Sequence, residues 1–379
     1  MNKKVCIVTW FSTPNFGTCL QAYALYSVVN SLGYDTSISR SYSYRRNANS
    51  LLKELVKCII PISILKKRQE CIIKNEVFRD VSSLKYGKVM DIDKIFHNVT
   101  PVNLLTLMLI KNQTDIFISG GDQIWNTRNY FDPYMFLSFA NMKRRISYGT
   151  SIGILDFQEE LKPVIKRLLN KYSNISVREL SAKDAISRLT KRNDIVTVLD
   201  PVFLLDSDNW DLFCSSSYIE FDMPSDYILC YFVGNNINYE NNILEIKDKF
   251  STSHIIQIEA SENSKFIIDG AFVYKDCGPR EFITLIKNAS LICTDSFHAI
   301  SFSIIFSKNF LAFKRFSDSD VNSQNSRVYD LLNKFNLTNR IYNYIGELDK
   351  GIDYSSIQEY IMREREKSLR YLINSLNNC

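Results

Sequence analysis

The chain has 379 residues, 45% of them hydrophobic, and a formal net charge of +5. Its length exceeds what a single hydrophobic core usually supports and predicts two domains, and its hydrophobic content excludes a mainly disordered protein. The 46 basic and 41 acidic residues are spread along the chain, a balance that does not indicate nucleic-acid binding.

Cysteine usage and hydropathy indicate a cytoplasmic protein. The nine cysteines form no CxxC pair and no zinc-binding spacing, and most stand in apolar stretches, as expected for reduced thiols. The apolar run after the basic start is too short for the core of a signal peptide. No apolar run reaches the roughly 18 residues that a membrane-spanning helix requires.

The first half of the chain alternates short apolar strands with polar turns. "KVCIVTW" (4–10) predicts a strand, and "TCLQAYALYSVVNSLGY" (18–34) predicts a helix that Gly33 ends. The basic, amphipathic residues 51–80 predict two helices broken at Pro61. Further strands are predicted in the stretches "TDIFISGGDQIW", "RRISYGTSIG", "NISVREL" and "IVTVLDPVFLL".

The strand pattern starts again after a boundary near residues 206–225. "DYILCYFVG", "HIIQIEA", "AFVYKD" and "SLICT" predict strands, "PREFITLIKNA" a helix, and the polar "NNINYENN" a surface loop. We therefore predict an α/β protein with two Rossmann-like domains that face each other. The expected units are residues 1–208, residues 209–350, and a charged C-terminal helix in residues 351–379 that packs back on the N-terminal domain.

Polar residues follow the predicted strands, where such sheets bind ligands. Asn15, Gly17 and Thr18 open the first helix, whose free N–H groups favour an anion; the alternative is a plain loop capped by Thr18. "SGGDQIWN" combines two glycines with hydrogen-bonding groups and Trp125, which suits sugar recognition, although a tight turn with a buried tryptophan would use the same residues. The substrate-binding candidates in this half are Asn15, Gly17, Thr18, Gln21, Gly120, Gly121, Asp122, Gln123, Asn126 and Ser151.

Arg178 and His298 are the two catalytic candidates. Arg178 ends the strand in "ISVRE" and offers a planar fork for a carboxylate or phosphate; the alternative is an ion pair with Glu179 or another acid. His298, one of only three histidines, follows Asp295 and Ser296, two further substrate-binding candidates, at the end of "SLICT". It is either a proton carrier in a cleft or a buried, satisfied histidine.

A metal site is not expected. The two "DSD" stretches, 206–208 and 318–320, place aspartates one residue apart, a spacing that can hold a divalent ion on a sugar nucleotide. The first precedes "NWDLF" and is typical of a helix cap, and the second lies in a polar loop.

Taken in order, "NFGTCLQAYAL", "DIFISGGDQIWN", "RRISYGTSIG", "ISVRE", "VLDPVFLL" and "CTDSFHAISFSIIF" resemble the polysaccharide pyruvyl transferase family. The resemblance implies a glycosyltransferase-B-like (GT-B-like) architecture and transfer of pyruvate from phosphoenolpyruvate to a hexose, of galactose type, with formation of a cyclic ketal and release of phosphate. The acceptor would be a bacterial capsule or exopolysaccharide, or its undecaprenyl-diphosphate-linked precursor. No cofactor besides the donor substrate is implied.

The family's strand-end arginine corresponds to Arg178, and the histidine of its late Phe-His motif corresponds to His298. Many members have an arginine before that pair, where this chain has Ser296. Arg327, or Arg144 and Arg145, are the candidates for the missing charge.

Two other functions remain open. A sugar-nucleotide-dependent GT-B glycosyltransferase would leave phosphoenolpyruvate untouched, and a non-catalytic glycan-binding relative would tolerate loss of His298. The basic stretch 53–68 either rests on anionic lipid at the inner face of the membrane or forms a helix packed on the core. The oligomeric state is not predicted.

Overall fold

The protein is described by a computed structural model. The structure describes residues 2–41, 81–128, 130–140, 145–236, 238–250, 254–260, 266–316, 325–343 and 351–377, with a few further residues between 63 and 74. Most of the basic stretch 51–80 and the second DSD stretch lie outside the described residues, so the expectations for them stay predictions.

The first half of the chain forms a parallel four-stranded sheet in the order β2-β1-β3-β4. Two short strands, β5 and β6, pair beside it. The strands are β1 (Lys4–Val8), β2 (Asp35–Ser39), β3 (Ile116–Ser119), β4 (Arg145–Ser147), β5 (Ser176–Val177) and β6 (Val196–Thr197). The helices are α1 (Phe16–Ser31), α4 (Ser83–Asp93), α5 (Leu104–Gln113), α6 (Lys162–Leu169) and α7 (Leu180–Thr190).

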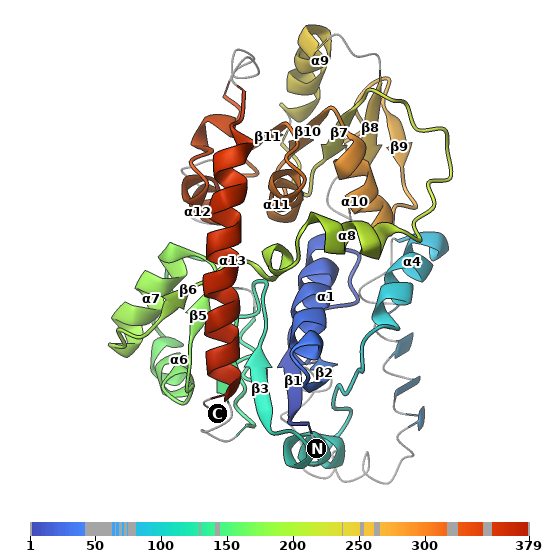
Figure 1. The fold of residues 1–379 in the computed structure, drawn as a ribbon. Helices are drawn as coiled ribbons and strands as arrows, with labels where there is room; N and C mark the ends of the chain where they lie inside the picture. Colours follow the sequence, from blue (N-terminus) through green and yellow to red (C-terminus); the bar gives the residue numbers. More distant parts are fainter. Residues whose placement is uncertain are drawn as a thin grey trace.

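The second half forms a parallel five-stranded sheet in the order β11-β10-β7-β8-β9. Its strands are β7 (Ile228–Tyr231), β8 (Ile255–Ile258), β9 (Phe272–Tyr274), β10 (Leu291–Thr294) and β11 (Phe310–Ala312). The remaining elements are η3 (Pro201–Leu204), α8 (Ser207–Cys214), α9 (Tyr239–Phe250), α10 (Pro279–Asn288), α11 (Phe297–Ile305), α12 (Ser326–Lys334), η4 (Thr338–Arg340) and α13 (Tyr354–Asn377). Figure 1 shows the two sheets one above the other, each with its own helices. The prediction of a two-part parallel α/β fold is confirmed.

Helix α1 connects the two halves. It is apolar around most of its circumference, since twelve of its sixteen residues are buried, and a helix of this kind must be covered on several sides. It packs on β2 and η3 of the lower half and on α10 and α11 of the upper half. Gly33, with φ of 88°, takes the left-handed conformation after the helix and ends it as predicted.

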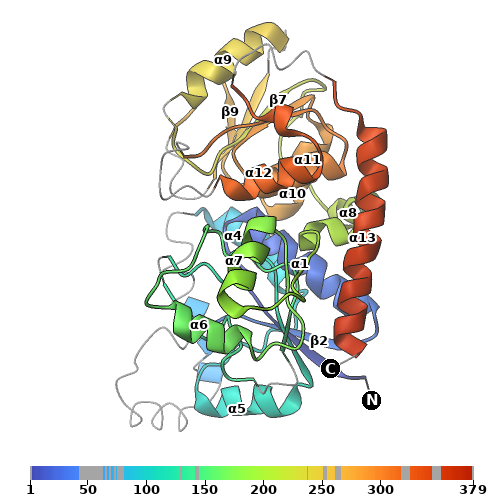
Figure 2. The ribbon, with the colours of Figure 1, turned by 90° about the vertical axis from the view of Figure 1, so that its left-hand side faces the viewer.

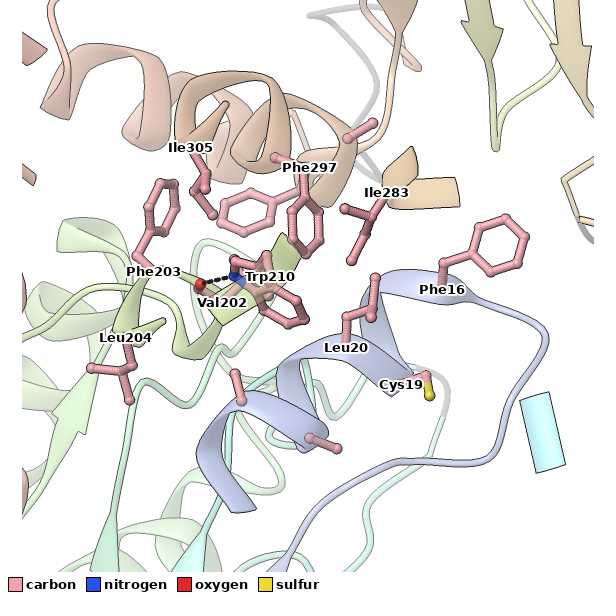
Figure 3. Packing of buried hydrophobic residues seen from close by; sticks show 14 of the residues in the cluster. Phe16, Cys19, Leu20, Val202, Phe203, Leu204, Trp210, Ile283, Phe297 and Ile305 are labelled. Atoms are coloured by element: carbon pink, nitrogen blue, oxygen red, sulfur yellow. Dashed lines mark hydrogen bonds between the residues drawn. The ribbon is translucent and has the colours of Figure 1, made fainter. Parts of the chain in front are cut away.

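A single hydrophobic cluster runs through the contact between the halves. Figure 3 shows side chains from α10 and α11 next to side chains from α1 and α8, with Phe297 and Ile283 above Trp210 and Leu20. The indole N–H of Trp210 donates to the carbonyl of Val202 at 3.0 Å, which satisfies its one donor inside the cluster. The two halves therefore share a core.

Helix α13 descends along one side of the molecule from the upper to the lower half (Figures 1 and 2). Gln358 in its first part donates to the carbonyl of Ile304 in α11, and Ser368 in its second part accepts from the N–H of Leu199. No helix in the described part of the chain has both the length and the apolar character that crossing a membrane demands.

Three details differ from the sequence-based expectations. The predicted surface loop "NNINYENN" includes the first turn of α9, which begins at Tyr239 because Tyr239 and Ile243 are buried at helical spacing. Strands β2 and β11 were not predicted; "DTSIS" is mostly polar and "FLA" has only three residues. Trp125 is fully buried, and its indole donates to the carbonyl of Met135, so the tight-turn interpretation holds for this residue.

Candidate functional site

The site lies where the carboxyl ends of both sheets meet. Arg178 follows β5 and is almost completely buried. Its Nε donates to Glu179 at 2.7 Å, its Nη1 donates to Asp200 at 2.5 Å, and its Nη2 lies 3.9 Å from Asp122. Burial by itself lowers the pKa of Arg178, but the charges of Glu179, Asp200 and Asp122 outweigh it and raise the pKa. The predicted pair with Glu179 thus forms within a larger cluster of three carboxylates.

His298 approaches this cluster from the upper half. It is the second residue of α11, and its Nε2 lies 3.7 Å from Oδ2 of Asp200. Phe297 beside it packs its ring 4.3 Å from the guanidinium carbon of Arg178, a cation–π contact between the halves. The two catalytic candidates of the sequence, far apart along the chain, are therefore brought to the same carboxylate.

Two more arginines of the upper half lie close to this cluster. Arg327 in α12 is buried, and burial together with the like charges of Arg178 and Arg315 lowers its pKa to about 9, against the opposing charges of Glu179 and Asp122. The charge of Arg327 is thus only partly balanced by its surroundings, a condition that favours an anion beside it. Gln123, with its amide turned so that the oxygen faces the arginine, accepts from Nη1 and Nη2 of Arg327 at 2.6 and 3.0 Å.

Asp295 organises the upper side of the site. Its carboxylate accepts from the backbone N–H groups of Val233 and Gly234, from the hydroxyl of Tyr239 and from Nε of Arg315. Nη2 of Arg315 also donates to the carbonyl of Asp295. With so many donors Asp295 serves to hold Arg315 and the loop after β7. Ser296 caps α11 by accepting from the N–H of Ala299.

The amino end of α1 closes the lower side. Asn15 is the cap of α1, since its side chain accepts from the N–H of Thr18, and the hydroxyl of Thr18 donates to Asp122 at 2.6 Å. Asp122 itself has a φ of 65°, which is strained for a residue other than glycine. Strain of this kind after β3 is typical of a functional site and leads to that hypothesis here.

Gln21, Gly120 and Gly121 bring backbone segments together. The amide nitrogen of Gln21 donates to the hydroxyl of Thr9 and to two carbonyl oxygens. A Cβ at Gly120 would lie 2.9 Å from Cβ of Thr9, and one at Gly121 would lie 2.6 Å from Oε1 of Gln21. These residues hold the ends of β1 and β3 and the first turns of α1 in place.

The turn after β3 packs against the loop after β4. The side-chain amide of Asn126 lies 2.9 Å from the side-chain amide of Gln123, and Oγ of Ser151 accepts from the N–H of Gly153. A Cβ at Gly153 would lie 2.1 Å from the side-chain amide of Gln123, so this glycine allows the two loops to touch. Arg145 lies at the opposite end of the sheet, since it opens β4, and Arg144 is outside the described residues.

Several buried polar atoms of the site have no hydrogen-bond partner. They are Oε1 of Gln21, Nη2 of Arg178, Oε2 of Glu179 and Nε2 of His298. Unpaired buried atoms are costly, and each calls for an explanation. Within the described residues no three or more His, Cys, Asp or Glu side chains are grouped to hold a metal ion.

The sequence analysis missed Asp200 and Arg315. Both obey the rule that located Arg178, because Asp200 follows β6 and Arg315 follows β11. Asp200 stood in the quoted stretch "VLDPVFLL", which was interpreted as a strand without singling out its carboxylate. Arg315 was not recognised as a residue that follows a strand, because β11 itself was not predicted.

The fold is similar to that of a solved sugar-nucleotide epimerase. The UDP-GlcNAc 2-epimerase of Neisseria meningitidis, solved with UDP-GlcNAc, is similar with a TM-score of 0.51 at 9% identity over 99% of this chain and 100% of that chain. UGT2 of Phytolacca americana, complexed with UDP-2fluoro-glucose and pterostilbene, gives 0.47 at 9% identity over 100% of both chains. A glycosyltransferase of Rickettsia africae gives 0.46 at 13% identity over 100% and 96%. The two Rossmann-like domains predicted in a GT-B-like arrangement are confirmed by the epimerase.

A comparison with curated protein sequences gives no match to this chain. The family model described as polysaccharide pyruvyl transferase, by contrast, matches residues 15–317. The matched region contains Arg178, Asp200, His298 and Arg315, and it ends before Arg327. Because this match covers most of the chain, the protein belongs to the polysaccharide pyruvyl transferase family, a family of transferase enzymes.

Proposed function

We propose that the protein transfers pyruvate from phosphoenolpyruvate to two hydroxyl groups of a hexose, of galactose type, and releases phosphate. The acceptor would be a bacterial capsule or exopolysaccharide, or its lipid-linked precursor. The observation that carries the proposal is the position of His298 close to two buried arginines, Arg178 and Arg327, and the partly buried Arg315, at the contact between the halves. Family membership supports the transfer of pyruvate to a polysaccharide in general.

The electrostatics support a small, highly charged donor. Phosphoenolpyruvate carries a carboxylate and a phosphate, and arginine is the side chain best suited to both groups. Arg327, whose charge is partly unbalanced, and Arg315 would bind the donor directly. Arg178 has two of its nitrogens engaged with carboxylates, so only Nη2 would reach the donor. The amino end of α1, which faces His298, adds N–H groups that favour an anion.

The chemistry requires proton transfer at a defined place. When C3 of phosphoenolpyruvate takes a proton, C2 becomes an oxocarbenium-like centre. A sugar hydroxyl attacks C2 and gives up its proton, phosphate leaves with the electron pair of its C2–O bond, and a second hydroxyl closes the ketal. Of the two hydroxyl protons, one replaces the proton given to C3 and the other goes with the phosphate. His298 would carry a proton between hydroxyl and C3, while the arginines stabilise the departing phosphate.

The reaction as proposed uses no metal and no cofactor besides the donor. We propose further that the enzyme works in the cytoplasm, where phosphoenolpyruvate would be at hand. Contact with the inner face of the membrane would be needed only if the acceptor is attached to a lipid such as undecaprenyl diphosphate.

The test is a transfer assay with purified protein, phosphoenolpyruvate and a panel of free and lipid-linked galactosides. We expect phosphate release together with a product heavier by one pyruvyl ketal, at a rate that EDTA leaves unchanged. UDP-glucose and UDP-GlcNAc in place of phosphoenolpyruvate serve as controls for a sugar-nucleotide enzyme and should give no product. Transfer from a UDP-sugar with no consumption of phosphoenolpyruvate would contradict the proposal, and full loss of activity in EDTA, restored by a divalent ion, would contradict the metal-free chemistry.

A further inference from the structure

Asp200 uses both carboxylate oxygens at the contact between the halves. Its Oδ1 accepts from the N–H of Val202 at 3.0 Å and so caps η3. Its Oδ2 accepts from Nη1 of Arg178 at 2.5 Å and lies 3.7 Å from Nε2 of His298. One buried side chain thus joins a local cap, a buried cation and the candidate proton carrier.

The imidazole of His298 has its two nitrogens in different surroundings. Nε2 is buried, lacks a hydrogen-bond partner and lies near Asp200. Nδ1 is on the side of Gly17, where a Cβ would lie only 2.0 Å from it. Gly17 belongs to the first turn of α1, the end of a helix that favours anions. The ring therefore presents Nε2 to the carboxylate and Nδ1 to the first turn of α1.

We propose that Asp200 is a positioning residue that keeps a proton on Nε2 of His298 and thereby leaves Nδ1 as the nitrogen that exchanges protons with the substrate. The role of Nδ1 rests on the proposed pyruvyl transfer, whereas the position of the proton does not. A neutral imidazole has one N–H, and an ionised carboxylate can only accept a hydrogen bond, so Asp200 selects the form protonated on Nε2. The separation of 3.7 Å is longer than a hydrogen bond, and catalytic hydrogen bonds of this kind tighten when substrate binds.

Asp200 is kept ionised by its neighbours. Burial by itself raises the pKa of Asp200, but the charges of Arg178 and His298 outweigh burial and hold the pKa below its usual range. The small cavity next to it, about 20 Å³, is lined by charged groups of both signs, namely Arg178, Arg327, Lys334, Glu179 and Asp330. Asp200 thus remains a hydrogen-bond acceptor near neutral pH, and it also stabilises the ring when Nδ1 takes up a proton.

The position of the proton can be observed directly. The chain has only three histidines, so long-range ¹H–¹⁵N spectra of the imidazole groups are simple, and the signals missing from His298→Gln identify His298. At a pH where the ring is neutral we expect its proton on Nε2. A proton on Nδ1 in the wild-type protein would overturn the proposal. This result does not depend on any activity, so it separates failure of this inference from failure of the proposed function.

Kinetics of Asp200→Asn test the positioning role itself. Asparagine keeps the size and the cap but places an amide N–H where an acceptor is needed, so turnover should fall about 10²-fold or more, with the Michaelis constant for phosphoenolpyruvate nearly unchanged. The pH profile of turnover should also shift, an effect that a structural role would not produce. Asp206→Asn is the matched control, since Asp206 likewise caps a helix, α8, and should keep wild-type turnover.

A double-variant cycle shows whether Asp200 acts through His298. The variant Asp200→Asn with His298→Ala should be no slower than His298→Ala alone. If the losses of turnover in the two single variants multiply in the double variant, Asp200 acts independently of His298 and the proposal is overturned. A large rise in the Michaelis constant with turnover intact would likewise overturn it, because Asp200 would then act by holding Arg178. If Asp200→Asn does not fold, the imidazole spectra of the wild-type protein decide alone.

Discussion

Arg178 and Arg327 are both buried in the site, yet their surroundings differ in sign. The three carboxylates around Arg178 raise its pKa despite burial, whereas burial and two neighbouring arginines lower the pKa of Arg327. For a basic group, a pKa raised in the folded state means that its charge stabilises the fold below that pKa, and a lowered pKa means that its charge costs stability. The charge of Arg178 therefore stabilises the folded state, whereas the charge of Arg327 lowers its stability.

The first prediction compares Arg178→Met with Arg327→Met near neutral pH. Arg178→Met leaves Glu179 and Asp200 without their cation, and loss of one partner in a buried ion pair typically costs about 3–5 kcal/mol. Arg327→Met removes a buried charge that lowers the stability of the folded state, so the melting temperature of this variant should stay near that of the wild type. Its Michaelis constant for phosphoenolpyruvate should nevertheless rise at least about tenfold, the equivalent of 1.4 kcal/mol. Equal losses of melting temperature in the two variants would contradict this electrostatic assignment.

The second prediction concerns His298. His298→Ala should fold and lose a factor of about 10² to 10⁴ in turnover per folded molecule, the usual contribution of a proton carrier. His298→Gln should retain donor binding better than catalysis, because it keeps a hydrogen-bonding side chain that cannot carry a proton. His254→Gln, at an exposed histidine outside the site, is the matched control. A well-folded His298→Ala protein with near wild-type turnover would rule out the catalytic role.

Single residues could be predicted where a strand made them conspicuous. Arg178 and His298 stand at the ends of clear apolar runs, and the structure brings both to Asp200. The sequence could not show that Arg178 is held by three carboxylates, because Asp122 and Asp200 come from other strands and meet it only in the folded sheet. It also could not distinguish Trp125 as a core residue, since burial depends on Phe136 stacking on it.

At the scale of elements, the contact between α1 and α11 joins the anion-favouring end of one helix to the histidine of the other. The contact requires a glycine, because a Cβ at Gly17 would lie 2.0 Å from Nδ1 and 2.3 Å from Cγ of His298. Gly87 in α4 also lies within a helix, but a Cβ there would meet nothing within 4 Å. Replacing each glycine by alanine therefore changes helix propensity in both cases, but only the replacement of Gly17 also disturbs His298.

The third prediction is that Gly17→Ala slows turnover at least about tenfold while Gly87→Ala does not. Alanine favours a helix over glycine by roughly 0.5–1 kcal/mol, so Gly87→Ala should melt at or slightly above the wild-type temperature. Gly17→Ala gains the same helix propensity, but its new Cβ displaces the imidazole of His298. The signals of His298 in the ¹H–¹⁵N spectra of this variant should therefore move. Unchanged turnover and spectra in Gly17→Ala would mean that the ring does not pack against α1 in solution.

Elements were predictable in proportion to their apolar length. The four-residue strands β7 and β10 are buried throughout and were predicted, as was the 24-residue α13. The strand β2 was missed because "DTSIS" gains its strand character from pairing with β1 and not from its own residues. The start of helix α9 was taken for a loop because "NNINYENN" contains five asparagines. In the folded protein the burial of Tyr239 and Ile243 decides in favour of the helix.

At the scale of the whole molecule, α13 fastens the two halves together beside the site. Arg365 in its middle donates to the carbonyls of Phe203 and Leu205, at the end of the segment that Asp200 begins. Farther along, the hydroxyl of Tyr371 donates to the carbonyl of Ser147 in β4. The shared hydrophobic cluster makes a second connection between the halves. These two links imply that the halves unfold together.

The fourth prediction is therefore a single calorimetric unfolding transition, which Arg365→Ala shifts downward without splitting. Hydrogen bonds from a charged group contribute about 1.5–3 kcal/mol, and Arg365→Ala would leave the carbonyls of Phe203 and Leu205 without this donor. Arg370→Ala on the same helix removes only an exposed pair with Glu366, whose contribution is about 0.3–0.5 kcal/mol, so it should melt within about a degree of the wild type. Two resolved transitions in the wild-type protein would show that the halves are independent units, and equal shifts in the two variants would mean that α13 does not fasten η3. A single transition that falls only in Arg365→Ala would place the stability of the site in the helix that spans both halves.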